Sequence, residues 1–452
     1  MSLDVAVVGS GYVGTVVAAC LAHVGHDVVA LEIDDDKRRV LEDGAAPFHE
    51  PGLHALLAAG LDSGRLRFTG DVDDAVAAAE IVFLCVGTPA GDDGRADIRF
   101  LEAAARSIAV AMTERKVLVT KSTVPIGSGQ WLQTVVEDAM AQHGGPFVPF
   151  AVASNPEFLR QGSAVEDYLH PDRVVLGSDD PAALDVLQEL YEPILGQDFD
   201  GGDRDQTPTL VRTGLTTAET VKYAANAFLA LKISYANEIA NVCELVGADV
   251  EEVTHAIGLD ARIGRRFLDA GIGWGGSCFG KDISELIAAA QDHGYEPRIL
   301  RATLEVNAAQ RGLVVRKLRR RLCGLRGRRV GLLGLAFKPE TDDLRDAPAI
   351  DIANWLVQGG ARVVAHDPVV KELRGVPEVL VVDDCYEVAD RADAVVLVTD
   401  WAEYRDLDLD EIRRRMRGVL FVDGRGVFDP EKVARAGLVF EGIGRAAQTL
   451  AR

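Results

Sequence analysis

The chain has 452 residues, too many for a single hydrophobic core, and this length predicts two to four domains. Its apolar fraction of 48% and charged fraction of 26% exclude the disordered and fibrous classes. The 48 Lys and Arg residues against 70 Asp and Glu residues give a net charge of −22. This charge argues against nucleic acids and anionic membranes as partners, because both are bound through basic patches.

The basic residues are unevenly divided, since only 10 of the 48 are lysines and the other 38 are arginines. An acidic surface with scarce lysine is typical of salt-adapted proteins, in which dense carboxylates keep the molecule hydrated. A GC-rich genome that favours Arg and Ala codons explains the same composition equally well. Both explanations stay open.

The six cysteines are scattered, with neither a CxxC pair nor a histidine at zinc-ligand spacing. This distribution predicts no disulfide framework and no metal site, and it fits a reducing cytoplasm. Cys20, Cys85 and Cys243 lie in apolar segments, where a cysteine is typically buried as a small hydrophobe.

The first predicted element is an apolar stretch without Asp, Glu, Lys or Arg between Asp4 and Asp27. A signal peptide or a membrane helix is the alternative, but the stretch has no basic start and three glycines interrupt it. We therefore expect a strand over Asp4–Val8, a tight turn, a helix to about Val24 and a second strand over 27–33.

The rest of the chain predicts three domains. An alternation of strands (80–86, 116–121, 147–154, 173–177) with helices (98–112) predicts a parallel sheet in residues 1–200. A polar, glycine-rich loop over 196–208 precedes an all-helical domain, residues 201–322, with helices over 217–247, 253–257, 282–290 and 299–322. Strands return over 329–335, 361–366, 394–399 and 419–423, in a third domain of residues 323–452. The predicted class is α/β, with two Rossmann-like, doubly wound parallel-sheet domains joined by an all-helical central domain.

Gly9, Gly11 and Gly14 have the spacing of a dinucleotide-binding turn between strand and helix. The first glycine permits the turn, the second lets the backbone approach a pyrophosphate, and the third allows close helix–strand packing. Glu32 ends the next strand 18 positions after Gly14, where a carboxylate binds ribose hydroxyls and repels a 2′-phosphate. The pattern predicts NAD as the cofactor. Lys37 either reaches the ribose or is solvated.

Cys278 lies in the glycine-rich sequence GGSCFGKD, ahead of a helix that we expect to start near Asp282. A helix N-terminus stabilises a thiolate, and Lys281 would act in the same direction. Asp282 could accept a proton or orient a water molecule. Cys278 is therefore the candidate nucleophile.

Glu157 follows a predicted strand, so its carboxylate is expected at the edge of the sheet where α/β enzymes bind ligands. It is a candidate general base, with a solvated loop acid as the alternative. Lys222 and Asn226 are four residues apart and share one helix face, where they could donate to an oxyanion. On spacing alone, a lysine that extends to solvent is the favoured interpretation of Lys222.

A series of motifs runs along the whole chain in the order GSGYVG, PFHEPGL, CVGTP, KSTVPIGSG, NPEFLRQGSA, KYAANAFLALKISYANE, GIGWGGSCFGKD and FKPETDDLRDAPA. With these motifs the chain closely resembles the UDP-glucose/GDP-mannose dehydrogenase family. The resemblance implies a four-electron oxidation of UDP-glucose to UDP-glucuronate with two NAD. In this reaction Cys278 would form a thiohemiacetal and then a thioester.

The resemblance also implies a role for each remaining catalytic residue. Lys222 and Asn226 match the groups that stabilise the oxyanion and alkoxide, and Glu157 matches the base of the thioester steps. Thr123 and Asp282 match the residues that hold the catalytic water.

Two sets of binding residues follow from the same resemblance. The implied cofactor contacts are Gly9, Gly11, Tyr12, Val13, Gly14, Glu32, Lys37, Thr88, Thr123, Lys281 and Arg345. The implied sugar-nucleotide contacts are Glu157, Phe158, Leu159, Lys222, Asn226, Arg262, Phe267, Gly275 and Lys338. Glu32 stands where the family more often has Asp, so ribose binding should persist with a longer reach. Gln161 replaces a more usual Glu that has no catalytic role.

The resemblance leaves the substrate and the assembly partly open. The sequence around Cys278 is most similar to the version that oxidises UDP-glucose, and GDP-mannose or another nucleotide sugar is the alternative. Arg262 resembles an arginine that reaches the substrate across a dimer interface, which implies a homodimer or a larger homo-oligomer. A catalytically inactive nucleotide-sugar sensor would be a different class of protein, but all the candidate catalytic residues are present.

Overall fold

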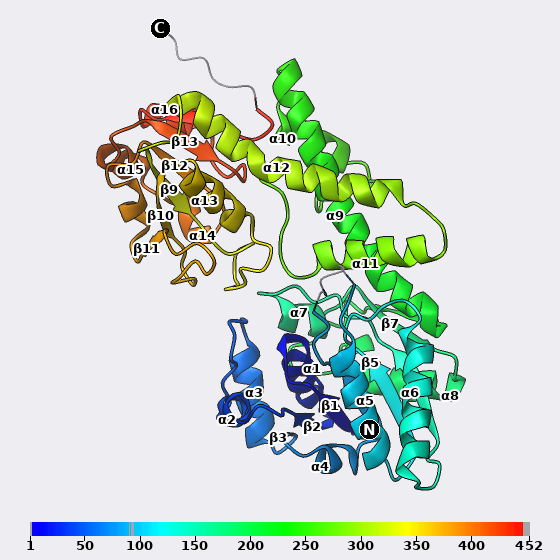
Figure 1. The fold of residues 1–452 in the computed structure, drawn as a ribbon. Helices are drawn as coiled ribbons and strands as arrows, with labels where there is room; N and C mark the ends of the chain where they lie inside the picture. The colour runs from blue at the N-terminus through cyan, green and yellow to red at the C-terminus, as the bar shows by residue number, and fades with distance from the viewer. Residues whose placement is uncertain (1, 90, 92–94, 446–452) are drawn as a thin grey trace. The chain divides into compact units, whose positions relative to one another are not determined.

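The computed structural model describes residues 2–89, 91 and 95–445 (Figure 1). They form two compact units, Met1–Ala225 with Ser284–Ala289, and Asn226–Ile283 with Ala290–Arg452. The first unit contains an eight-stranded sheet and the second a six-stranded sheet. The predicted α/β class is confirmed, since two largely parallel sheets are separated along the chain by a helical region. The three-domain division at residues 200 and 322 stays a prediction.

The sheet of the first unit has the order β3-β2-β1-β4-β5-β6-β7-β8, which reverses direction at β1 as doubly wound sheets do. Strands β1 to β6 are parallel, whereas β7 pairs with β6 in the antiparallel sense. The strands are β1 (Asp4–Val8), β2 (Asp27–Leu31), β3 (Leu66–Thr69), β4 (Ile81–Leu84), β5 (Lys116–Thr120), β6 (Phe150–Ser154), β7 (Arg173–Ser178) and β8 (Thr209–Thr213).

Helices cover both faces of this sheet, because side chains on a strand alternate between the faces. Val5 and Val7 of β1 pack in one apolar cluster with α1, α3, α7 and α8. Ala6 and Val8 pack in a second cluster with α4, α5 and α6, and Figure 1 shows α5 beside α6. The helices are α1 (Tyr12–His23), α2 (Asp35–Glu42), α3 (Leu53–Asp62), α4 (Val72–Val76), α5 (Arg99–Ala111), α6 (Ser128–His143), α7 (Ala164–Leu169) and α8 (Pro181–Leu195).

Three features of this sheet differ from the sequence prediction, and the first is the edge strand β3, which was not predicted. The prediction of a parallel sheet is wrong for β7 and β8, which run opposite to the other strands. Strand β8 also lies in a region expected to be helical, because its sequence TLVRT is largely exposed and lacks the apolar run of a buried strand.

The helical region consists of α9 (Leu215–Val246), α10 (Val250–Gly258), α11 (Phe279–Asp292) and α12 (Arg298–Leu322). These four helices confirm the predicted helical segments, with longer bounds for α10 and α11. The boundary between the two compact units falls within α9. Helix α12 ends at Leu322, and its C-cap residue Cys323 takes the left-handed conformation with φ of 54°.

The sheet of the second unit is parallel throughout, in the order β11-β10-β9-β12-β13-β14. The edge strands β11 and β14 have three residues each and were not predicted, since so short a strand carries no periodic signal. The strands are β9 (Arg329–Leu333), β10 (Arg362–His366), β11 (Leu380–Val382), β12 (Ala394–Leu397), β13 (Leu420–Asp423) and β14 (Val439–Glu441). They are accompanied by α13 (Pro348–Gln358), the 3₁₀ turn η1 (Cys385–Ala389), α14 (Ala402–Arg405), α15 (Leu409–Arg415) and α16 (Pro430–Arg435).

The apolar stretch near the N-terminus is part of the core of the first unit. Helix α1 has 12 residues, and those from Gly14 to Ala22 are buried. Within the described ranges, none of the helices has the combined length and hydropathy that crossing a membrane requires.

Candidate active site

The glycine fingerprint, Gly9, Gly11 and Gly14, forms the turn between β1 and α1 and the start of the helix. Gly9 has φ of 96°, and its N–H donates to the carbonyl of Leu31 at 3.1 Å. A Cβ on Gly14 would lie 1.9 Å from the carbonyl oxygen of Gly9, so only glycine permits this approach of helix and strand. A Cβ on Gly11 would meet no described atom within 4 Å. The turn therefore leaves open the position where a pyrophosphate approaches the N-terminus of α1.

Glu32 follows β2 at the edge of this turn and is 7% exposed. Lys37 Nζ lies 2.6 Å from Glu32 Oε2, and the N–H of Asp34 donates to Oε1 at 3.1 Å. The sequence left Lys37 either in reach of the ribose or solvated. In the structure it forms an ion pair with Glu32, the predicted ribose-binding carboxylate. A bound ribose would share Glu32 with this ammonium.

The loops after β4 and β5 are tied together beside the fingerprint. The hydroxyl of Thr88 donates to the carbonyl of Thr123 at 2.7 Å. Thr123 also lines a pocket that contains Glu157 and Lys222. The structure thus brings together three predicted catalytic residues of the first unit.

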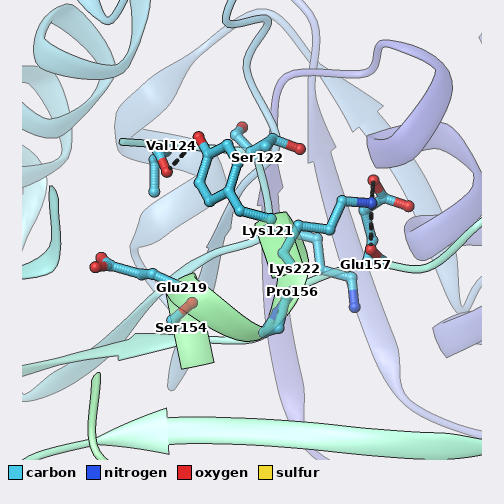
Figure 2. Close-up of a pocket in the computed structure, with 10 residues that line it drawn as sticks. Lys121, Ser122, Val124, Ser154, Pro156, Glu157, Glu219 and Lys222 are labelled. Atoms are coloured by element: carbon cyan, nitrogen blue, oxygen red, sulfur yellow. Dashed lines mark hydrogen bonds and ion pairs between the residues drawn. The ribbon is translucent and has the colours of Figure 1, made fainter. Parts of the chain in front are cut away.

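Glu157 and Lys222 form a buried ion pair in this pocket, and Figure 2 shows the two side chains facing each other. Lys222 Nζ lies 2.7 Å from Glu157 Oε1 and donates to the Glu157 carbonyl at 2.6 Å. The N–H of Leu159 donates to Glu157 Oε2 at 2.7 Å. Glu157 is 7% and Lys222 is 5% exposed, so the alternatives of a solvated acid and a solvent-reaching lysine are both wrong.

Lys121 lines the same pocket and was missed by the sequence reasoning. It is 4% exposed, and its ammonium donates to Asn155 Oδ1 at 2.7 Å, lying 5.4 Å from the centroid of the Tyr168 ring. Among the described residues, no carboxylate lies within ion-pair distance of it. Burial lowers the pKa of Lys121 to about 8. Its place directly after the buried strand β5 is the sequence signal that could have found it.

Glu219 is a second residue that was missed. This side chain of α9 is 3% exposed and accepts hydrogen bonds from the N–H groups of Gly127 at 2.7 Å and Gly129 at 2.8 Å. Burial raises the pKa of its carboxyl group. Its position three residues before Lys222 places both side chains on the same face of α9.

Cys278 is the N-cap residue of α11, and its thiol is exposed. The helix begins at Phe279, so the predicted start near Asp282 is wrong. The ring of Phe279 packs edge-on against Trp274 at 5.8 Å, which anchors the first turn earlier than its polar sequence indicates. This start places the sulfur at the end of the helix dipole, where a thiolate is stabilised.

Asp282 lies in the first turn of α11 and is fully buried. The amide of Asn226 donates to its Oδ2 at 2.6 Å. Lys281 Nζ lies 2.9 Å from its Oδ1, at angles outside those of a hydrogen bond, and neither of these two atoms has a hydrogen-bonding partner among the described residues. Oδ1 therefore keeps its capacity to accept a hydrogen bond from a ligand.

The loop that precedes Cys278 is fixed by the segment before α13. The N–H of Gly276 donates to the carbonyl of Arg345 at 3.0 Å, and a Cβ on Gly275 would lie 2.2 Å from the carbonyl oxygen of Asp346. The pKa of Arg345 is raised, chiefly by its hydrogen bonds to Asp343 and to a lesser extent by the charge of Cys278. A guanidinium in electrostatic range of the sulfur favours the thiolate.

The remaining predicted contacts are described by their local surroundings. The Arg262 side chain is 88% exposed and pairs with Asp260. Phe267 has φ of 66°, and Lys338 Nζ lies 5.9 Å from the ring of Phe337. The ring of Phe158 stacks under the guanidinium of Arg173 at 3.9 Å.

The comparisons with known proteins agree along the whole chain. Three models of the UDP-glucose/GDP-mannose dehydrogenase family match it: the NAD binding domain over residues 3–195, the central domain over 216–309 and the UDP binding domain over 331–430. The chain belongs to the UDP-glucose/GDP-mannose dehydrogenase family.

Individual relatives are similar over nearly their full length. The UDP-glucose 6-dehydrogenase of Rhizobium meliloti is 44% identical over 98% of this chain and 100% of its own. The UDP-glucose 6-dehydrogenase TuaD of Bacillus subtilis is 42% identical over 98% of this chain and 93% of its own. The structure of a UDP-glucose dehydrogenase from Pyrobaculum islandicum is 40% identical, with a TM-score of 0.88 over 99% of this chain and 98% of that one.

Proposed function

We propose that the protein is an NAD-dependent UDP-glucose 6-dehydrogenase. It converts UDP-glucose, two NAD and one water into UDP-glucuronate and two NADH. The observation that carries the proposal is the exposed thiol of Cys278 at the N-cap of α11, because an aldehyde cannot donate a hydride until a nucleophile makes it tetrahedral. The relatives at 42–44% identity, all named for this activity, support UDP-glucose as the substrate.

The fingerprint turn, with its open position at Gly11 and with Glu32 at its edge, fits NAD. When bound there, NAD would supply the hydride acceptor for C6 of the sugar in each of the two oxidations. Thr88, Thr123 and Arg345 complete the proposed cofactor contacts.

Cys278 supplies the covalent step. Its thiolate attacks the C6 aldehyde to form a thiohemiacetal, and loss of a hydride from C6 converts this adduct into a thioester. Water then attacks the thioester carbonyl, the carbon–sulfur bond breaks, and the acid leaves with the thiolate restored. The helix N-terminus and the charge of Arg345 favour the thiolate throughout.

The polar side chains proposed to surround the reacting carbon stabilise charge, transfer protons and hold water. The ammonium of Lys222 and the amide of Asn226 donate to the oxygen that gains charge in each tetrahedral species. Glu157 accepts a proton through its contact with Lys222, and Thr123 and Asp282 hold the attacking water. Lys222 and Glu157 fix each other, as do Asn226 and Asp282, which lowers the reorganisation needed in the transition state.

The sugar nucleotide is held by residues outside this group. Phe158, Leu159, Phe267 and Gly275 contact it, and Lys338 neutralises part of its phosphate charge. The match of residues 331–430 to a UDP binding domain supports a uridine nucleotide as the ligand of the second sheet.

We also propose that the protein is at least a homodimer in the cytoplasm. One side of α9 exposes Phe228 at 62%, Tyr235 at 49% and Val242 at 47%, seven residues apart, with Leu245 at 86%. A stripe of this spacing is suited to packing against a second helix. Light scattering on the purified protein tests this: a mass of one chain contradicts it.

Initial rates with UDP-glucose, GDP-mannose, UDP-N-acetylmannosamine and UDP-N-acetylglucosamine test the proposed activity. UDP-glucose should react at the highest kcat/KM and yield two NADH per sugar. Cys278→Ser should stop after the first oxidation, lowering turnover by about a thousandfold, because the hydroxyl is a far weaker nucleophile. A protein without turnover of UDP-glucose contradicts the proposal.

A further inference from the structure

The segment Pro47 to Leu53, with the sequence PFHEPGL, has no place in the proposed chemistry. It connects α2 to α3 and lies within the first unit. Its single buried charge is Glu50, which is 7% exposed. A buried carboxylate needs donors around it, and these donors identify what the segment does.

Three groups from two different parts of the chain donate to Glu50. The hydroxyl of Tyr12 and the N–H of Gly162 donate to Oε2, the latter at 2.7 Å. The N–H of Ala164 donates to Oε1 at 2.8 Å. In the described part of the chain no Lys or Arg forms an ion pair with Glu50, so these three donors carry its charge.

Tyr12 belongs to the cofactor fingerprint, where it is the first residue of α1. Its ring packs on Phe48 of the same segment, with the centroids 4.8 Å apart. Burial and the neighbouring carboxylate raise the pKa of the Tyr12 hydroxyl far above its usual range, so it stays a donor at every working pH. Glu50, through the hydroxyl, and Phe48, through the ring, thus both fix Tyr12, which directly follows Gly11.

Gly162 belongs to the loop between β6 and α7, residues 155–163, which also carries Glu157 and Leu159, and Ala164 is the first residue of α7. Gly162 has φ of 80°, so the loop turns sharply where Glu50 holds it. The loop is held at its other side by Arg160, whose N–H and guanidinium bond to Asp167. The carboxylate of Glu50 therefore fixes the end of the loop that carries the proposed base Glu157 and the proposed sugar contact Leu159.

We propose that Glu50 is a positioning residue that couples the cofactor fingerprint to the loop 155–163, so that each ligand changes the affinity of the protein for the other. The inference rests on the proposed function for the identity of the two ligands. A shift of Tyr12 on cofactor binding moves the carboxylate, and the carboxylate carries the backbone of Gly162 and Ala164 with it. Because binding free energies are linked, the effect is equal in both directions.

The experiment measures the dissociation constant of NADH by fluorescence, without and with saturating UDP-glucose, and the reverse pair by calorimetry. The wild-type protein should show a ratio of at least about fivefold, the lower range for coupled sites. Tyr12→Phe removes the donor on the cofactor side, and Glu50→Gln turns an amide toward backbone donors. Both variants should bring the ratio to about one.

Asp167→Asn is the matched control, since it loosens the same loop without touching Glu50. It should alter the affinity for UDP-glucose and keep the wild-type ratio. A wild-type ratio of one, or a ratio kept in Tyr12→Phe, overturns the inference. If Glu50→Gln does not fold, as thermal melting would show, Tyr12→Phe alone decides. The proposed function is judged separately by wild-type turnover, so a protein that turns over UDP-glucose without a cross-effect refutes the coupling alone.

Discussion

The two largely parallel sheets begin with the same turn, but the residues around it differ. Gly9 after β1 and Gly334 after β9 have φ of 96° and 94°, and each N–H donates to the last residue of the neighbouring strand, at 3.1 Å and 2.8 Å. In the first sheet the helix follows at once, and a carboxylate stands beside an open turn. In the second sheet residues 334–347 intervene before α13, and they carry Lys338 and Arg345.

The acidic residue after the second strand shows the difference most clearly. Glu32 after β2 is held by Lys37 and the N–H of Asp34 and can turn toward a ribose. Asp367 after β10 is fully buried and accepts bonds from the N–H groups of Leu335, Ala336, Val369 and Val370 and from the indole of Trp401. The same position after the second strand thus carries a proposed cofactor contact in the first sheet and a buried structural carboxylate in the second.

The largest expected effect is at Asp367. Asp367→Asn turns an amide toward two or more backbone donors, and we expect it to lower the free energy of unfolding by about 4 kcal/mol. Glu32→Gln should leave stability nearly unchanged and raise the KM for NAD. Thermal melting and initial rates on both variants check this, and a stable Asp367→Asn protein would remove the distinction.

The next effect separates two glycines of one turn. Gly14→Ala places a Cβ 1.9 Å from a carbonyl oxygen and should cost at least about 3 kcal/mol through the forced shift of α1. Gly11→Ala meets no described atom within 4 Å, so its cost should fall on NAD affinity with the melting temperature kept. Equal losses of stability in the two variants would contradict this assignment.

Lys121 provides a pH-dependent prediction for the first sheet. Its pKa is about 8 in the folded protein and 10.5 in its ordinary range, so between these values the unfolded chain binds more protons. This group's contribution to stability therefore rises with pH, by about 2 kcal/mol from pH 7.5 to 9.5.

Lys121→Met should abolish that rise, and Lys371→Met, whose side chain is 59% exposed, should keep it. Denaturant unfolding at the two pH values measures the difference between each variant and the wild type. If the free energy of unfolding of Lys121→Met rises with pH as much as that of the wild type, the buried lysine does not titrate in this range.

The smallest effect concerns two matched hydroxyl groups. Thr88 donates to Thr123 at 2.7 Å in the first sheet, and Thr399 donates to Ala336 at 2.6 Å in the second. Each threonine-to-valine change should cost about 1 kcal/mol of stability. Only Thr88→Val should also raise the KM for NAD, and a similar rise in Thr399→Val would speak against separate uses of the two sheets.

The sequence predicted the elements that have a strong local pattern. Strand β1 and helix α1 were found because their apolar run is continuous, and Cys278 because its glycine turn precedes a helix. Strands β3, β8, β11 and β14 were missed because edge strands are short and need not be apolar on both faces.

Contacts between distant residues were beyond this reasoning. The partners Glu157 and Lys222 are 65 residues apart, and each alone fitted a solvated side chain as well as a catalytic one. Lys121 was missed because its cation is held by an amide oxygen and tyrosine rings, for which no spacing rule exists. The antiparallel β7 likewise depends on the path of the chain across the sheet rather than on its own sequence.

The preference for arginine over lysine in this chain does not hold for the buried basic residues. Of the ten lysines, Lys116, Lys121, Lys222 and Lys317 are buried, in a chain whose other basic residues are almost all arginines. A primary ammonium is compact and fits where a planar guanidinium does not, so these interior positions cannot follow the preference of the surface. Replacing Lys222 by Arg would consequently disturb the pocket although it preserves the charge, and amine-directed labelling reagents would find few targets on the folded protein.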